Sequence, residues 1–297
     1  MFVSSILAVA CPADVDLGFV HLDWFKLVVL GIVQGITELL PISSTAHLRI
    51  VPGLLGWPDP GSAFSAAMQL ASLVAVLTYF WSDLRNLARG TYQAIAQSNY
   101  MSFSFRLTVG LLLGTVPIII AGLLLKKVLN ACNSPLRSLI VVGMASVAMS
   151  LLLALAEIYG KRKRDFKRLT PIDGILVGIA QAFALIPGVS RSGSTLTAGL
   201  FLGMERETAA RFSFLLGLPA VVLAGIVELH LLFKAGLDFS GWLSLLIALT
   251  SASISAFIVI YGLLHFLERQ STWIFVWYRL LMGLFLIVGV AIGWFKA

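Results

Sequence analysis

Charged side chains are scarce in this chain. Only 12% of its 297 residues are Asp, Glu, Lys or Arg, against about 25% in ordinary soluble domains. Hydrophobic residues make up 59% of the chain, where soluble domains have about 45–50%. The composition therefore excludes an ordinary soluble domain and indicates an integral membrane protein.

Cysteines are few, and no basic cluster stands at the N-terminus. Cys11 and Cys132 are the two cysteines, too few for a disulfide framework or, by themselves, for a zinc site. The topology below places both on the outer side, where one disulfide is conceivable, although two unrelated residues are the simpler interpretation. The apolar run 2–10 has no basic residue ahead of it, so we do not expect a cleaved signal peptide.

Long apolar runs, in contrast, are plentiful. A helix needs about 20 apolar residues to cross a bilayer, and six plain runs qualify: 64–82, 107–125, 138–157, 209–229, 241–264 and 274–295. Two further apolar regions, 25–56 and 172–203, are interrupted near the middle by Pro, Ser and a charge. Each has about 32 residues, too few for two full spans, so we expect each to enter the membrane and return as a re-entrant hairpin.

The interrupted regions also resemble each other. Sliding the chain against itself aligns QGITELLPISSTAH (34–47) with QAFALIPGVSRSGS (181–194), so that Gln34 meets Gln181 and Ser43 meets Ser190. Each half then has one interrupted region followed by three spans, which inverts the second half relative to the first. The sequence predicts an all-α fold of six transmembrane helices plus two re-entrant helix hairpins in an inverted-topology repeat.

The loops indicate how this fold is oriented. Basic residues concentrate in the loops on one side, above all in KRKRDFKR (161–168), and the positive-inside tendency makes that side cytoplasmic. Both termini then lie outside the cytoplasm. The expected segments are an outer N-terminal piece (1–23), a first repeat (24–160), a basic loop (161–171) and a second repeat (172–297). The net charge of +7 is explained by contact with anionic lipid, so we expect membrane lipids and no nucleic acid as partners.

Two charges at the interruptions call for a function. A charge in hydrocarbon costs at least about 2.5–3.5 kcal/mol, yet Glu38 lies in the first interrupted region and Arg191 in the second. The pseudo-symmetry would bring them together. Two interpretations stay open: an ion pair that only locks the halves to each other, or a reactive site.

The residues around the two charges favour a site for phosphate. Pro41 and Pro187 end one helix each, and the hydroxyl residues that follow can cap a returning helix, so two helix N-termini face one volume beside a guanidinium. Glu38 would repel an anion, so we expect it to act as a base or to bind a divalent cation. Ser44 and His47 are spaced for a nucleophile and its proton partner, although capping explains them equally well. The residues expected to bind the phosphate are Gln34, Ser43, Thr45, Ser190, Ser192, Ser194 and Thr195.

These residues resemble known motifs. QGITE (34–38) resembles the [E/Q]-x-x-x-E motif, and PGVSRSGST (187–195) the P-G-x-S-R-S-x-x-T motif, of the undecaprenyl-diphosphate phosphatase family, also called BacA or UppP. LPISSTAH (40–47) and RFSFLLGLP (211–219) are similar to further blocks of that family. The resemblance covers nearly the whole chain after residue 24.

The resemblance implies a multi-pass enzyme of the bacterial plasma membrane. Such an enzyme hydrolyses undecaprenyl diphosphate with Mg²⁺ or Ca²⁺, recycles the lipid carrier for peptidoglycan and is linked to bacitracin resistance. It implies that Glu38 is the essential acid, Ser44 the nucleophile or phosphate-binding hydroxyl, His47 its proton partner and Arg191 the diphosphate-binding group.

Three questions stay open on the sequence. Many family members have glutamate where this chain has Gln34, so a second carboxylate is missing here. A transporter or flippase for a phosphorylated lipid is the alternative function, because inverted repeats with broken helices are also a transporter architecture. The oligomeric state is the third question, since the sequence is compatible with a monomer and with a homo-oligomer.

Overall fold

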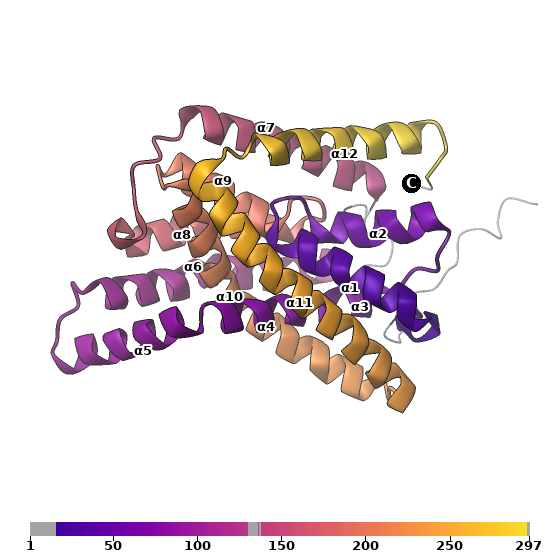
Figure 1. The fold of residues 1–297 in the computed structure, drawn as a ribbon, viewed down its shortest axis with the longest axis horizontal. Coiled ribbons are helices and arrows are strands. Elements are labelled where there is room, and N and C mark those ends of the chain that lie inside the picture. Colours follow the sequence, from indigo (N-terminus) through magenta and orange to yellow (C-terminus); the bar gives the residue numbers. More distant parts are fainter. Residues whose placement is uncertain (1–15, 130–135, 137, 296–297) are drawn as a thin grey trace, which may run out of the picture.

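The computed structural model describes residues 16–129, 136 and 138–295, and this part of the chain forms a bundle of helices (Figure 1). Its described residues form no β-strand and only one isolated β-bridge, between Arg164 and Met204. The all-helical membrane class expected from the sequence is therefore confirmed. Cys11 and Cys132, and with them any disulfide, lie outside the described residues.

Within the described part of the chain, five helices are long and apolar enough to cross a membrane. They are α6 (Phe103–Leu129), α7 (Leu139–Tyr159), α10 (Arg206–Lys234), α11 (Phe239–Arg269) and α12 (Trp273–Ala291). The remaining expected span, 64–82, falls on two short helices, α3 (Ser62–Ala67) and α4 (Gln69–Tyr79). Together with α5 (Trp81–Ala96) they form a sixth candidate that is bent by 73°.

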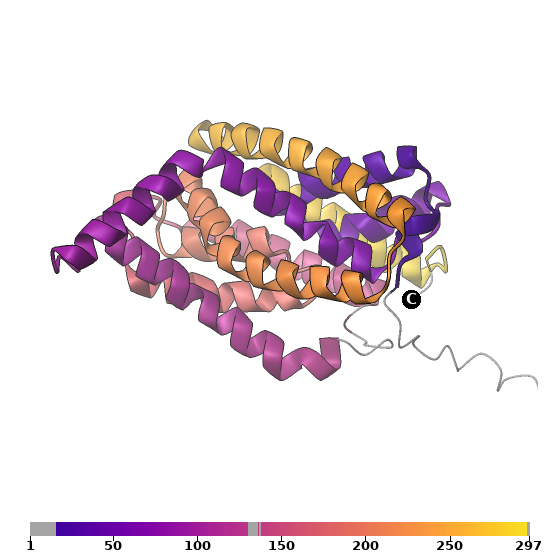
Figure 2. The same ribbon diagram turned by 90° about the horizontal axis from the view of Figure 1, so that it is seen from below.

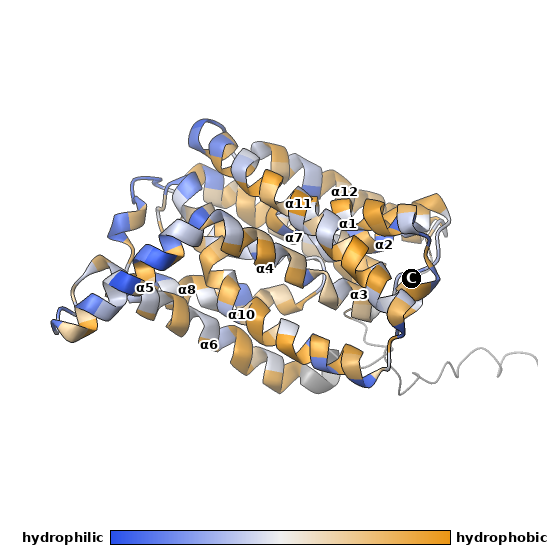
Figure 3. Ribbon diagram, turned by 60° about the horizontal axis from the view of Figure 1, so that its bottom comes forward, coloured by the Kyte–Doolittle hydropathy of each residue, from blue (hydrophilic) through white to orange (hydrophobic). Residues whose placement is uncertain are grey.

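Helix α5 differs from expectation, because most of its residues lie between the expected spans 64–82 and 107–125, where the sequence predicts a loop. The segment is charged and amphipathic rather than apolar, so it does not qualify as a span by itself, but this composition does not prevent helix formation. It leaves the bundle together with the first turns of α6 (Figure 2). Hydrophilic residues gather at this end of the molecule, whereas the long helices are mainly hydrophobic (Figure 3).

Both interrupted regions are broken helices. The first consists of α1 (Trp24–Leu39) and α2 (Ser44–Leu55), and the second of α8 (Pro171–Ala182), the short 3₁₀ helix η4 (Phe183–Leu185) and α9 (Arg191–Phe201). The residue before each returning helix has a positive φ, 72° at Ser43 and 69° at Ser190. A residue with a side chain rarely adopts this conformation unless its surroundings enforce it. The two residues aligned by the internal repeat therefore make the same turn.

Small residues let the first helix of each broken region press against a long helix. Helix α1 lies along α11, and α8 lies along α6. A Cβ atom added at Gly35 would come within 2.3 Å of the Ala252 carbonyl oxygen, and one at Gly178 within 2.1 Å of the Gly114 carbonyl oxygen. Small residues spaced four apart are a known packing signal in membrane helices. In the same bundle α7 lies along α12 (Figure 1).

Part of the basic loop serves the fold. Arg164 forms two hydrogen bonds with the carboxylate of Asp173, of 2.7 and 2.6 Å, at the start of α8. Arg162 donates to the buried carboxylate of Glu157, which also binds Arg206 and Thr272. These two arginines join the loop to α7, α8 and α10, so the charge available for anionic lipid is carried mainly by the exposed side chains of Lys161, Lys163, Lys167 and Arg168.

Candidate active site

The two broken helices meet at Glu38 and Arg191. Glu38 is in the last turn of α1 and Arg191 begins α9. The Arg191 Nη2 atom lies 3.2 Å from Glu38 Oε1, and the two side chains are only 17% and 8% exposed. The acid of the first half and the guanidinium of the second therefore share one largely dry volume.

The carboxylate of Glu38 also binds a hydroxyl. Its Oε2 atom accepts hydrogen bonds from Ser44 Oγ, at 2.5 Å, and from Gln34 Nε2, at 3.1 Å. A short O–H···O⁻ bond is among the stronger hydrogen bonds in proteins, and it aims the hydroxyl proton at a base. The Gln34 Oε1 atom is buried and has no hydrogen-bond partner among the described residues, so it remains free to bind a ligand.

Arg191 is held from the side by helix α10. Its Nη1 atom donates to the carbonyl oxygen of Gly217 at 3.2 Å. A Cβ atom at that glycine would lie 2.4 Å from Nη1, which is closer than such atoms approach. Gly217 thus provides the space in which the guanidinium lies. Its segment was identified as a family block, but no role was predicted for the residue.

His47 does not contact Ser44 as expected. Its Nδ1 atom lies 2.7 Å from the Ser43 carbonyl oxygen, which can only accept, so Nδ1 carries the proton. The neutral ring then accepts at Nε2 from the Tyr278 hydroxyl, 2.6 Å away, and the two rings are stacked with centroids 5.6 Å apart. The structure thus pairs Ser44 with Glu38 and His47 with Tyr278, a residue that lies in the expected span 274–295.

The other expected phosphate ligands are used mainly to hold the helices. Ser192 Oγ lies 3.1 Å from the Glu38 carbonyl oxygen and 2.9 Å from that of Leu40, so it links α9 to the first break. Ser190 Oγ accepts from the backbone of α9, and Ser194 and Thr195 donate to the Arg191 carbonyl oxygen. Thr45 is exposed. The groups best placed for a ligand are therefore Ser44, Arg191 and Gln34.

A buried arginine that sequence reasoning missed lies behind the site. Arg279 of α12 is 1% exposed, and it donates to the carbonyl oxygens of Pro41, Gly188 and Val189 at 2.7–3.0 Å. The run 274–295 was treated as a plain span. A charge inside an apolar run is itself the signal that marks such a residue.

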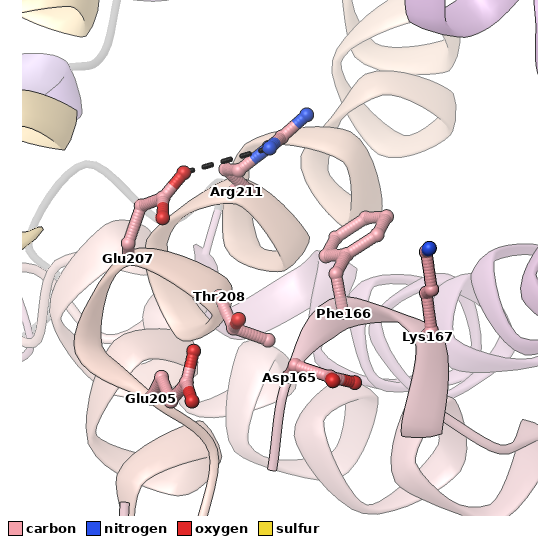
Figure 4. A pocket seen from close by; sticks show the side chains of 7 residues that line it. All are labelled: Asp165, Phe166, Lys167, Glu205, Glu207, Thr208 and Arg211. Atoms are coloured by element: carbon pink, nitrogen blue, oxygen red, sulfur yellow. Dashed lines mark hydrogen bonds and ion pairs between the residues drawn. The ribbon is translucent and has the colours of Figure 1, made fainter. Parts of the chain in front are cut away.

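A separate pocket of about 260 Å³ shares no residue with this site (Figure 4). Its lining includes the carboxylates of Asp165, Glu205 and Glu207, which would repel an anion. Its Arg211 is already paired with Glu207 and with Asp83 of α5. The pocket is therefore unsuited to a phosphate.

Comparison with known proteins supports the resemblance seen in the sequence. The family described as "Bacitracin resistance protein BacA" matches residues 27–285. A protein named "Undecaprenyl-diphosphatase" from Trichormus variabilis is 53% identical over 285 residues, 96% of this chain and 89% of the relative. "Undecaprenyl-diphosphatase 2" from Mesorhizobium japonicum is 60% identical over 261 residues, 88% of this chain and 99% of the relative. The chain belongs to the BacA family.

Proposed function

We propose that this chain hydrolyses undecaprenyl diphosphate to undecaprenyl phosphate and inorganic phosphate in the bacterial plasma membrane, which recycles the lipid carrier for cell-wall synthesis. The observation that carries the proposal is the carboxylate of Glu38, which contacts the Ser44 hydroxyl through one oxygen and the Arg191 guanidinium through the other. The names of the relatives support the same activity.

The contacts suggest the order of events. Ser44 Oγ attacks the terminal phosphorus while its proton passes to Glu38, and the bond from that phosphorus to the bridging oxygen breaks, releasing the lipid monophosphate. Arg191 balances the charge that gathers on the terminal phosphate oxygens. Water then attacks the phosphoserine, Ser44 Oγ leaves and regains the proton from Glu38, and the proton of the water goes to the released phosphate.

A divalent cation, Mg²⁺ or Ca²⁺, belongs to the proposal. The described residues contain no cluster of three or more His, Cys, Asp or Glu side chains suited to a metal. Glu38 and the unpartnered Gln34 Oε1 atom would provide two oxygen ligands, and phosphate oxygens and water would provide the rest, as hard cations accept. When bound, the cation would supply positive charge to the phosphate oxygens. Gln34 fits this role as a neutral ligand in place of a carboxylate.

Release of phosphate in detergent tests the proposed activity. The purified protein should release inorganic phosphate from undecaprenyl diphosphate in micelles, and a chelator should lower the rate at least about tenfold if the cation balances phosphate charge. Undecaprenyl monophosphate is the matched control and should release none. A transporter or flippase would leave both lipids intact, because transport breaks no bond, so an inactive wild type would contradict the proposal.

The inverted repeat and its re-entrant hairpins are part of this proposal. They are supported by the matching turns at Ser43 and Ser190, and by equivalent packing of α1 on α11 and of α8 on α6. In this arrangement both termini lie outside the cytoplasm.

Labelling of the basic loop tests this orientation. A cysteine introduced at the exposed Lys163, in a chain freed of its two native cysteines, should resist a membrane-impermeant reagent in intact cells and react in opened cells. A cysteine at the exposed Asp59 on the opposite side should react in both. Ready labelling of position 163 from outside would reverse the proposed topology.

Loss of the Tyr278 hydroxyl should slow turnover without weakening binding. Tyr278→Phe keeps the ring stacked on His47 but leaves Nε2 without its donor, so we expect kcat to fall about tenfold, as one lost hydrogen bond predicts, with KM nearly unchanged. Trp277→Phe is the matched control, since that side chain is exposed and stacks on Trp273 instead. Equal activity of Tyr278→Phe and wild type would remove Tyr278 from the site.

A further inference from the structure

The guanidinium of Arg279 is buried inside the bundle without a carboxylate. Its side chain is 1% exposed, and no ion pair joins it to an acid among the described residues. A charge in this position is costly unless other polar groups surround it. Backbone carbonyl oxygens provide those groups here.

The carbonyl oxygens come from both breaks. Nη1 donates to Pro41 at 2.9 Å in the first break, and Nη2 donates to Gly188 at 2.7 Å and to Val189 at 3.0 Å in the second. Broken helices inside a membrane leave carbonyl groups without partners, and each must be satisfied by protein. One side chain from α12 therefore satisfies both breaks and joins them.

The space for this guanidinium depends on a glycine of α9. A Cβ atom added at Gly193 would lie 2.6 Å from Arg279 Nη1. Gly193 is two residues from Arg191, and Pro41 is three residues from Ser44. Arg279 therefore lies against chain segments that are only two or three residues from the reacting groups of both halves.

We propose that Arg279 is a positioning residue that fixes Ser44 and Glu38 of the first break relative to Arg191 of the second. The inference rests on the proposed function. Burial separates Arg279 from the substrate, since its side chain is 1% exposed; both terminal nitrogens donate to carbonyl oxygens, and its Nε atom is buried without a hydrogen-bond partner among the described residues. Its loss should therefore lower kcat far more than it raises KM.

A double-mutant cycle tests the proposal in the phosphate-release assay. We expect kcat to fall at least about 100-fold in Arg279→Met, as misplacement of reacting groups predicts, to recover in part in Arg279→Lys, and to fall at least about tenfold in Gly193→Ala. KM should stay within about threefold in all of them. The double variant Gly193→Ala/Arg279→Met should be no worse than Arg279→Met, because the added methyl group then has no guanidinium to displace.

Three results would overturn the positioning role. They are wild-type kcat in Arg279→Met, a raised KM with unchanged kcat, and fully additive losses in the double variant. Gly262→Ala is the matched control, since nothing lies within 4 Å of that added Cβ, and it should behave like wild type. If Arg279→Met does not fold, Gly193→Ala retains the arginine and still tests the role through its kcat and KM.

A distance measurement separates this inference from the proposed function. Spin labels on Gly53→Cys in α2 and Phe183→Cys in η4, both exposed, report the spacing of the two broken regions without any substrate. In a chain lacking the native cysteines, Arg279→Met should broaden or shift that distance distribution. An unchanged distribution contradicts the positioning role, whereas an inactive wild type contradicts only the proposed activity.

Discussion

Ser44→Ala should lower the rate of phosphate release at least about 10³-fold, as removal of a nucleophile does in other hydrolases. The hydroxyl lies 2.5 Å from Glu38 Oε2 and is the one hydroxyl of the site that we find bonded to this carboxylate. Alanine keeps the backbone of α2 and removes only the attacking oxygen. Glu38 and Arg191 remain paired, so the affinity for the diphosphate should change little.

Thr45→Ala is the matched control for Ser44→Ala. It removes a hydroxyl from the next residue of the same helix turn, but this side chain is exposed, and the hydrogen bonds found for the Glu38 carboxylate among the described residues come from Gln34, Ser44 and Arg191. We expect its activity to equal that of the wild type. Retention of most activity in Ser44→Ala would instead indicate that water activated by Glu38 attacks the phosphorus, and Glu38→Gln should then abolish the remaining rate.

Arg191→Lys should lower kcat about 10³-fold, since an arginine that stabilises phosphoryl transfer is worth about 10³–10⁵ in rate. The planar guanidinium contacts Glu38 through one terminal nitrogen and Gly217 through the other. An ammonium group cannot reproduce this fork, nor bind phosphate oxygens in a bidentate way. Phosphate release under saturating substrate measures the effect.

Gly217→Ala tests the position of the guanidinium without changing its charge. The added methyl group would lie 2.4 Å from Nη1 and push it away, so kcat should fall about 10–100-fold, as misplacement of a reacting group predicts. Gly122→Ala in α6 places the same methyl group in open space and should have no effect. Wild-type activity in Gly217→Ala would show that Arg191 acts from another position.

Patterns within short segments predicted much of this molecule. Long apolar runs indicated the membrane class, and the alignment of Ser43 with Ser190 matched two residues that share a rare backbone conformation. The unusual cost of a charge in hydrocarbon singled out Glu38 and Arg191, which lie 3.2 Å apart. Hydropathy reports the length of an apolar run and not the angle between two helices, so the bend in the sixth candidate was missed. Helix α5 was missed because it is charged and therefore has no apolar run.

The residues that sequence analysis missed act through partners on other helices. Gly217 matters because a guanidinium from another helix lies against it, and Tyr278 because its hydroxyl reaches His47 of α2. Arg279 was hidden in a run that met the length criterion for a span. Their roles depend on partners more than 25 residues away in the chain, which no local pattern contains.

Amino-acid order alone therefore established the membrane class, the two interrupted regions and the residue types at the breaks, since these depend on hydrophobic length, on proline and on charge within one stretch of chain. Packing of distant helices decided which groups meet: Ser44 binds Glu38 and not His47, and Arg279 joins the two breaks. A hydrogen bond needs its two atoms about 3 Å apart at a favourable angle. Such distances between distant segments arise only when the whole bundle has formed.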